Sequence, residues 1–183
     1  MTDKHHAWKK TRSRIAHKNP YFRVKEDDIV KPGGKKKKYY AIESKDSVYI
    51  VALTAKKEVV LVRLYRYPTA KISWEVPGGG SDGQEPSAAA KRELWEETGY
   101  KARKWKKAGS FQIWSGVARE MGHTFIARGL TQTGKDKARD EGIEEMKAFS
   151  FSDIRKMIRS SELDDSKTIA ALAQAALALG IKI

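Results

Sequence analysis

The chain has 183 residues, of which 40% are hydrophobic and 33% are charged, a balance typical of a globular domain with a charged surface. This length suffices for one domain with a substantial core. No apolar run approaches the roughly 20 residues that span a bilayer, and the basic first residues lack the apolar stretch of a secretory signal. The lack of cysteine excludes disulfides and thiolate metal sites and favours a cytoplasmic protein.

The net charge of +14 is concentrated near the N-terminus. Residues 1–40 contain 13 Lys or Arg against 4 Asp or Glu, whereas the other 143 residues contain 24 against 19. The densest run is the four lysines at residues 35–38. Such a run is usually a solvated turn, but clustered cations also bind nucleic acid by releasing counterions from its phosphates. No motif that reads nucleic acid accompanies the run, so nucleic acid is the second choice of partner.

In chain order, residues 1–18 are predicted to form a basic, flexible arm, and residues 19–183 a single domain. β-Branched and aromatic residues then recur in short runs between turn residues, which indicates strands. These strands are expected at residues 21–24, 28–30, 39–42, 48–53, 59–64 and 72–76. The runs at 48–53 and 59–64 are continuously apolar, as expected of strands buried on both faces.

The second half of the chain combines helices with further strands. Residues 86–98 are predicted to form a helix, because Pro86 suits a first turn and Gly99 supplies the stop. The later elements are strands near residues 105–113, 123–128 and 145–151 and helices at residues 152–159 and 166–179. Ser152 is the expected N-cap of the first of these helices, and Gly180 ends the second. This order predicts an α/β fold with a mixed sheet covered by helices.

The segment most informative about chemistry is a glycine-rich loop, residues 77–84, followed by the predicted helix. Glycines let the backbone approach a ligand without obstruction by side chains. On the helix, Glu93, Glu96 and Glu97 are spaced i, i+3 and i+4, which brings three carboxylates onto one face. Oxygen ligands of this kind favour Mg²⁺, or Mn²⁺, over zinc. The alternative is a solvated acidic face that pairs with neighbouring basic residues.

This segment resembles the Nudix box, G-x5-E-x7-R-E-U-x-E-E-x-G-U, in which U is a bulky apolar residue. Counted from Gly78, five residues lead to Gln84 and seven more lead to Arg92, and residues 93–100 then match in register. On these residues the chain is identified as a member of the Nudix hydrolase family. The resemblance implies an α/β/α sandwich with a mixed β-sheet and N-terminal antiparallel strands. The metal ligands that it implies are Glu93, Glu96, Glu97 and the backbone carbonyl of Gly78 or Gly79.

The box has a glutamate where this sequence has Gln84, with Glu85 beside it. In the family that glutamate supports the box arginine, here Arg92, so we expect weaker support of Arg92 and a retained metal site. The loop either keeps the family spacing with Gln84 or is one residue shorter, with its glycine register shifted.

Residues 59–79 resemble the ADP-ribose pyrophosphatase branch, in which V-R-Q-Y-R and W-E-L-P-A-G precede the box. The candidate substrate-binding residues are Arg66, Trp74, Glu75 and Glu120. Arginine suits a pyrophosphate because its planar fork can bind two oxygens, although Arg66 could also be an ordinary cation at a strand end. A proline typical of the branch is Gly116 here, which leaves the identity of the sugar open.

In the same branch a glutamate on a late loop is the favoured general base, and residues 139–145 are the matching stretch. Glu141 fits the pattern best and Glu144 is second, each with a solvated acidic turn as the alternative. The catalytic candidates are Glu141, Glu144, Arg92 and Glu96. Trp114 could stack on a base, although a buried core position is the commoner role of tryptophan.

The resemblance implies a Mg²⁺-dependent homodimer that hydrolyses a nucleoside diphosphate sugar, with ADP-ribose giving AMP and ribose 5-phosphate. Two alternatives remain open. An RNA-directed Nudix enzyme acting on 5′ ends or caps would make use of the lysine-rich N-terminus. A non-catalytic nucleotide-binding module would account for Gln84.

Overall fold

The structure is a computed structural model that describes residues 8–134 and 142–182. The chain divides into two compact units. Unit 1 comprises the described residues up to Lys45 together with residues 112–120, and unit 2 comprises residues 46–111 and the described residues from Met121 onward. This division differs from the predicted one, an arm of residues 1–18 followed by a single domain.

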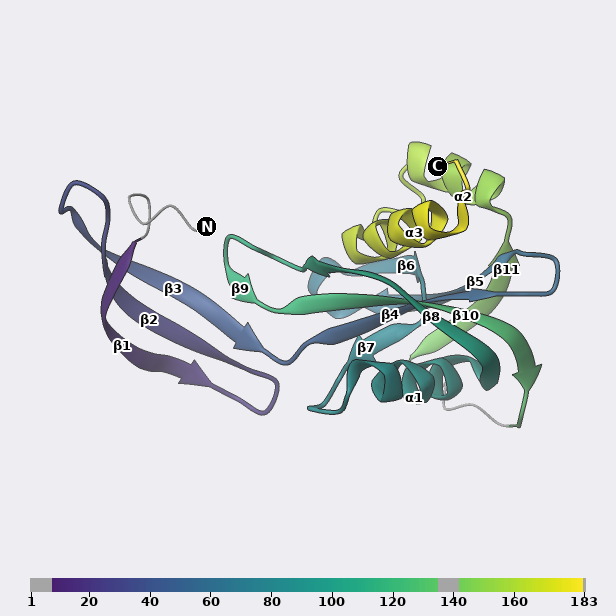
Figure 1. Ribbon diagram of the computed structural model, residues 1–183, viewed down its shortest axis with the longest axis horizontal. Coiled ribbons are helices and arrows are strands. Elements are labelled where there is room, and N and C mark those ends of the chain that lie inside the picture. The colour runs from purple at the N-terminus through teal and green to yellow at the C-terminus, as the bar shows by residue number, and fades with distance from the viewer. Residues whose placement is uncertain (1–7, 135–141, 183) are drawn as a thin grey trace. The chain divides into compact units, whose positions relative to one another are not determined.

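Unit 1 contains strands β1 (Lys9–Lys18), β2 (Phe22–Val30), β3 (Lys36–Ser44) and β9 (Ala118–Arg119). They form a four-stranded sheet in the order β1-β2-β3-β9, in which the first three strands are antiparallel (Figure 1). The predicted N-terminal antiparallel strands are therefore present. Their predicted start at residue 21 was wrong, because β1 already pairs with β2. Opposite charges favour this pairing, since Arg14 lies directly opposite Glu26 and forms an ion pair with it.

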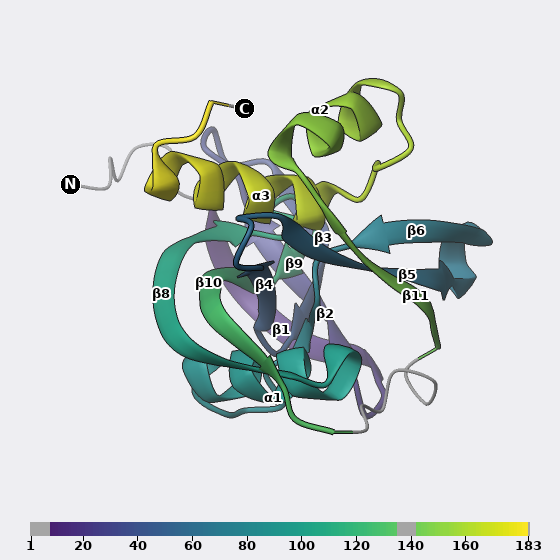
Figure 2. The ribbon, with the colours of Figure 1, turned by 90° about the vertical axis from the view of Figure 1, so that its right-hand side faces the viewer.

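Unit 2 contains the remaining elements. They are β4 (Ser47–Leu53), β5 (Val59–Arg66), β6 (Lys71–Glu75), β7 (Gly78–Gly80), α1 (Pro86–Thr98), β8 (Tyr100–Gln112), β10 (Met121–Gln132), β11 (Ile143–Phe149), α2 (Phe151–Arg159) and α3 (Ser166–Leu179). The sheet has the order β11-β5-β4-β10-β8, with β6 on β5 and β7 on β4. It is mixed, because β4 runs parallel to β10 but antiparallel to β5. α1 lies on one side of the sheet and α2 and α3 on the other, which is the predicted α/β/α sandwich (Figures 1 and 2).

The core of unit 2 is built on the two apolar runs that were predicted to be strands buried on both faces. Every residue of β4 from Val48 to Leu53 is buried, and so are Val59, Val60, Leu61 and Val62 of β5. Against this sheet α1 packs Ala89, Ala90 and Leu94, all fully buried. Burial of these apolar side chains stabilises the position of α1, and α1 bears the predicted carboxylates.

Two local predictions were wrong. The glycine-rich segment is not only a loop, because residues 78–80 pair with β4 as strand β7. The N-cap of α2 is Ser150 rather than Ser152, since the Ser150 hydroxyl accepts a hydrogen bond of 3.1 Å from the amide of Asp153. None of the helices in the described ranges is long and apolar enough to cross a membrane.

Candidate functional site

The first component of the site is the glycine strand β7. Gly78 lies opposite Tyr49 of β4, and a Cβ atom at Gly78 would lie 2.2 Å from the carbonyl oxygen of Val48. At Gly79 a Cβ atom would lie 2.7 Å from Oε1 of Glu93. Glycine is therefore required for this strand to pair closely with β4 while it also contacts a carboxylate of α1.

α1 has the predicted bounds and brings two glutamates against β7. Glu93 and Glu97 lie one helical turn apart and are 8% and 7% exposed. Oε2 of Glu97 accepts a hydrogen bond of 2.9 Å from the amide of Gly78. Glu96 is directed toward Arg92, whose Nη1 atom lies 2.7 Å from its Oε2 atom. Glu97 is thus hydrogen-bonded to the glycine strand and Glu93 lies against it, while Glu93 and Glu96 both pair with the box arginine.

Arg92 connects several acidic side chains of this segment. Its Nη2 atom lies 2.8 Å from Oε1 of Glu93 and 3.5 Å from Oδ2 of Asp82. Burial lowers the pKa of Arg92, but the carboxylates of Glu96 and Glu93 outweigh burial, so the pKa lies above its ordinary value. Arg92 is therefore firmly cationic and holds the carboxylates beside it in place.

Gln84 does lie beside Arg92, as the family spacing predicts. Nε of Arg92 donates to Oε1 of Gln84 over 3.4 Å, a long hydrogen bond. Asp82 supplies a nearby negative charge that glutamine lacks, and it adopts φ 52° in the turn before α1. Arg92 is therefore supported by a weak contact with the neutral side chain of Gln84 and by a contact with the charged side chain of Asp82.

The donor set near β7 fits a hard divalent cation in its chemistry. It offers only oxygen atoms, two of the carboxylates are buried, and Gly79 leaves room for them where a side chain would not. Within residues 8–134 and 142–182, no three Asp, Glu or His side chains are grouped closely enough to hold a metal ion. In the structure Arg92 pairs with Glu93 and Glu96, while Glu97 binds the amide of Gly78.

Arg66 and Glu75 form a bidentate ion pair between the neighbouring strands β5 and β6. Nε and Nη2 of Arg66 donate to Oε1 and Oε2 of Glu75 at 2.8 and 2.6 Å. Glu75 is 4% exposed, whereas 41% of the Arg66 side chain is exposed. The hydrogen bond to Glu75 raises the pKa of Arg66, and the charges of Glu97 and Asp165 act in the same direction. Arg66 is therefore fixed in orientation and lies within electrostatic reach of a box glutamate.

A pocket of about 400 Å³ opens beside this ion pair, and we name it the Arg66 pocket. Its size is within the range of about 300–1,000 Å³ that is usual for small-molecule sites. Arg66, Ser73 and Glu75 line it from β5 and β6, and residues 164–167, at the start of α3, line it from the other side. The α3 contribution was missed in the sequence, where the only signal was an Asp at 165 in the N-cap position.

The other two candidate substrate-binding residues, Trp74 and Glu120, do not line the Arg66 pocket, and their role stays a prediction. Trp74 is buried, and its ring packs edge-on against that of Phe149, with centroids 5.0 Å apart, so it belongs to the core. Trp114 is 59% exposed in the turn between β8 and β9, so the interpretation as a buried core residue was wrong. Glu120 belongs to unit 1, where its Oε2 accepts a hydrogen bond of 2.8 Å from the hydroxyl of Ser44.

Of the two candidates for the general base, Glu141 lies outside the described residues. Glu144 is exposed on β11, where the pairing with β5 shifts between Ile143 and Glu145. Such a bulge redirects a side chain and is frequent beside active sites. The role of either glutamate stays a prediction.

The sequence-family model of the NUDIX domain matches residues 43–172 of the chain. The chain belongs to the Nudix family. A second model, the nucleoside diphosphate sugar hydrolase N-terminal domain, matches residues 8–42. The boundary between the two matches in this Nudix protein falls close to Lys45, where the first segment of unit 1 ends.

Individual proteins agree with this assignment. The chain is 33% identical over 149 residues to an ADP-ribose pyrophosphatase of Bacillus subtilis, covering 80% of each protein. It is 30% identical over 152 residues to a methanol dehydrogenase activator of Bacillus methanolicus, covering 82% of each. The crystal structure of an ADP compounds hydrolase superposes with a TM-score of 0.82, covers 94% of both chains and is 17% identical, which supports the Nudix fold.

Proposed function

We propose that this Nudix protein hydrolyses the pyrophosphate linkage of a nucleoside diphosphate sugar, and that ADP-ribose is its substrate, with AMP and ribose 5-phosphate as products. The observation that carries the proposal is the position of Arg66. This arginine lines a pocket of small-molecule size and lies within electrostatic reach of Glu97 of the Nudix box. A cationic fork beside a metal-binding motif suits a pyrophosphate.

In this proposal the ion pair with Glu75 orients Arg66 before substrate arrives. Two of its nitrogens bind Glu75, which leaves Nη1 and the exposed edge of the guanidinium for a phosphate oxygen. Because the ion pair with the buried Glu75 already holds Arg66 in one orientation, the arginine loses little conformational freedom when it binds substrate. Asp164 and Asp165 on the opposite wall are ion-paired with Lys71 and Lys167, which line the same pocket, so this wall offers both carboxylate and ammonium groups to the hydroxyls and phosphates of a substrate.

Glu93 and Glu97, with Glu96 beside them, would hold Mg²⁺, for which Mn²⁺ is the alternative. When bound, the ion neutralises phosphate oxygens and lowers the pKa of an attacking water. Arg92 keeps Glu93 and Glu96 in position through its short contacts with both. Glu141 or Glu144 would accept the proton of the water, and a carboxylate suits this step because it is ionised at neutral pH.

A homodimer that associates through unit 1 is part of the proposal. Unit 1 exposes several large apolar side chains, among them Trp8, Ile15, Tyr21 and Tyr40. Large apolar side chains that are exposed in one chain are candidates for burial in an interface between chains. Light scattering of the purified protein should give twice the chain mass, and a monomer at every concentration would rule out this part.

RNA is the second candidate substrate, and the charge of unit 1 favours it. Residues 8–45 and 112–120 together contain 14 Lys or Arg against 5 Asp or Glu. In the part of unit 1 that the structure describes, Lys9, Lys10, Arg12, Lys36 and Lys37 form no side-chain ion pair. Such cations would be free to contact a phosphate backbone.

Product analysis tests the proposal. The purified protein is incubated with Mg²⁺ and, in parallel, with ADP-ribose, GDP-mannose, ADP-glucose or 5′-triphosphorylated RNA. We expect AMP and ribose 5-phosphate from ADP-ribose at the highest kcat/KM of the set. Release of pyrophosphate from RNA at a higher kcat/KM would favour the second candidate, and the absence of product from every substrate would exclude both.

A further inference from the structure

A second pocket in unit 2 has no place in the proposed reaction. It has a volume of about 530 Å³ and lies at the C-terminal end of α3, so we name it the α3 C-terminal pocket. The Arg66 pocket, by contrast, is lined by the residues at the N-terminal end of α3. The helix has 14 residues, so its two ends are roughly 21 Å apart at 1.5 Å per residue.

The pocket combines an apolar lining with exposed cations. Leu53, which is buried, and Phe151 and Leu179, which are half-buried, contribute apolar surface. Lys57, Arg103 and Arg128 contribute positive charge and are all exposed. No carboxylate is among the described residues that line it. The pocket therefore offers apolar contact together with three positive charges.

These three cations differ from the arginines of the proposed active site. Arg66 and Arg92 are paired with carboxylates at 2.6–2.8 Å. The side chains of Lys57, Arg103 and Arg128 form no hydrogen bond or ion pair within the described ranges. Three like charges without counterions around one pocket repel one another, and a bound anion would relieve that repulsion.

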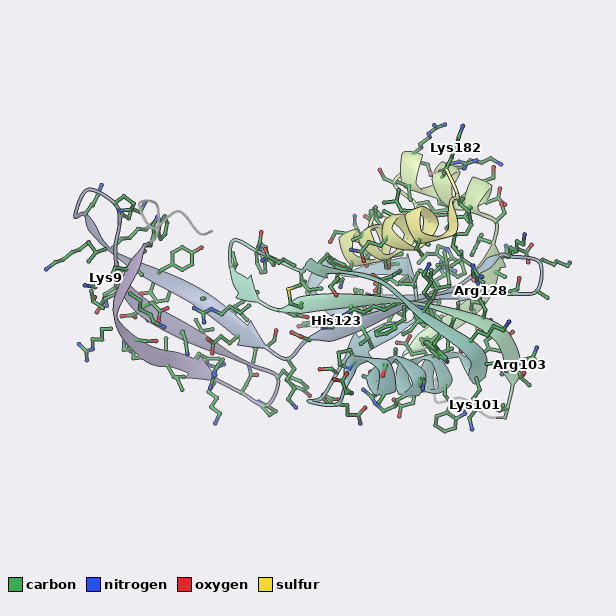
Figure 3. The ribbon with its side chains drawn as sticks, viewed as in Figure 1. Lys9, Lys101, Arg103, His123, Arg128 and Lys182 are labelled. Carbon is green, nitrogen blue, oxygen red and sulfur yellow. The ribbon has the colours of Figure 1, made fainter. Side chains whose placement is uncertain are left out.

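The backbone helps to position two of the cations. Arg128 of β10 lies opposite Leu53, the last residue of β4. Gly129, which follows it, adopts φ 67°, and a Cβ atom there would lie 3.1 Å from Nε of Arg103. The glycine thus allows a positive φ within β10 and the close approach of the Arg103 guanidinium at the same time. Figure 3 labels Arg103 and Arg128 at the same end of unit 2.

We propose that the α3 C-terminal pocket binds an amphipathic organic anion, a molecule with an apolar body and a phosphate-like head group. The apolar body would replace water against Leu53, Phe151 and Leu179. The head group would accept hydrogen bonds from Arg103 and Arg128, whose guanidinium groups suit the oxygens of a phosphate. Inorganic phosphate alone lacks the apolar contact, and a neutral amphiphile lacks the ionic one.

Titration calorimetry with three probes tests this pocket. The probes are octyl phosphate below its micellar concentration, inorganic phosphate, and octyl glucoside, which has the same tail and no charge. We expect octyl phosphate to bind at least about tenfold more tightly than either of the others, because it makes both kinds of contact. Its affinity should fall as salt is added. Equal affinity for octyl phosphate and octyl glucoside, or no binding of octyl phosphate, would overturn the proposal.

Substitutions locate the binding. R103A and R128A should each weaken octyl phosphate about tenfold, the effect of losing a charge-assisted hydrogen bond. R159A is the matched control, since Arg159 is an exposed arginine of unit 2 that does not line the pocket, and it should leave the affinity within about twofold. R66A should also leave the affinity for octyl phosphate unchanged. Loss of binding in R66A, with normal binding in R103A and R128A, would assign the probe to the Arg66 pocket and refute the inference.

Discussion

The two units of the chain use their charges in different ways. In unit 1 the described residues have a net charge of +9, and five of its exposed cations form no side-chain ion pair in the described ranges, namely Lys9, Lys10, Arg12, Lys36 and Lys37. Unit 2 has 22 Lys or Arg against 17 Asp or Glu over more than twice as many residues. There Glu75, Glu93 and Glu97 are buried, and the neighbouring Arg66 and Arg92 are ion-paired.

The difference indicates where a single charge matters. Substitution of an exposed, unpaired lysine by a neutral residue should change the stability little, because water screens its charge in both the folded and the unfolded chain. A buried carboxylate is costly to form and is retained where chemistry or an ion pair requires it. We therefore expect substitutions in the unit 2 site to change turnover strongly, and substitutions in unit 1 to act mainly on stability and on binding of polyanions.

The largest expected effect follows from Glu93→Gln and Glu97→Gln. Each should lower kcat for ADP-ribose by at least about 100-fold, because a proposed metal ligand loses its charge. The fold should persist, since glutamine has nearly the same shape and can still accept a hydrogen bond. Glu162→Gln, at an exposed glutamate of unit 2, is the matched control and should be silent. Near-normal turnover in both site variants would remove these residues from the metal site.

Arg66→Ala should lower kcat/KM by about 10- to 100-fold, because the proposed contact of its guanidinium with a phosphate oxygen is lost. It should also destabilise the protein by roughly 1–2 kcal/mol, since Glu75 is left buried and unpaired beside a half-exposed position. Arg63→Ala is a close control. The Arg63 side chain is also 41% exposed, but its partner Glu145 is exposed too. Equal kinetic effects of the two substitutions would contradict the assignment of Arg66 to substrate.

Gln84→Glu should preserve or modestly raise stability, by up to about 1 kcal/mol, because it places a further negative charge beside Arg92. Thermal unfolding and kcat, measured on the same preparation, check this. Asp82→Asn is the companion change and should lower stability by a similar amount. A large loss of activity in Gln84→Glu would mean that the loop has the other glycine register.

The stability of unit 1 should depend on pH in the acidic range because of Glu26. Hydrogen bonds from Arg14 and Lys38 lower the pKa of Glu26 from its usual 4.5 to about 2. Because the folded pKa is the lower one, the stabilisation is complete above about pH 4.5 and is lost as the pH falls toward 2. Amide chemical shifts of β1 and β2 should report this loss, and Glu26→Gln should abolish most of its pH dependence. An identical acid midpoint in both proteins would contradict this account.

The fold of unit 2 could be predicted from sequence largely because its signals are local. The apolar run at residues 59–62 and the stop at Gly99 each determine an element without reference to the rest of the chain. β1 was missed because all of its residues are exposed, so no apolar alternation marks it. β7 was missed because three glycines have no strand propensity, and their pairing depends on β4.

The candidate site could be predicted from sequence only where its signals are local. The motif predicts the order of Glu93, Glu96 and Glu97 along α1, but not that Arg92 pairs with two of them. The wall formed by residues 164–167 could not be foreseen, because it lies nearly 100 residues from Arg66 in sequence and meets it only through the tertiary fold. Trp114 shows the same limit, since its turn position rather than its residue type determines its exposure.

The most direct test of the central claim compares ADP-ribose with 5′-triphosphorylated RNA across a range of salt concentrations. The full-length protein and a variant with Lys36, Lys37 and Lys38 changed to Gln are assayed for kcat/KM and for RNA binding. We predict efficient hydrolysis of ADP-ribose that is the same in both proteins, because the Nudix box and Arg66 lie in unit 2. The claim would be contradicted by negligible hydrolysis of ADP-ribose together with tight RNA binding that weakens with salt. In that case the slope of log affinity against log salt concentration should steepen by about 0.7–0.9 per neutralised phosphate.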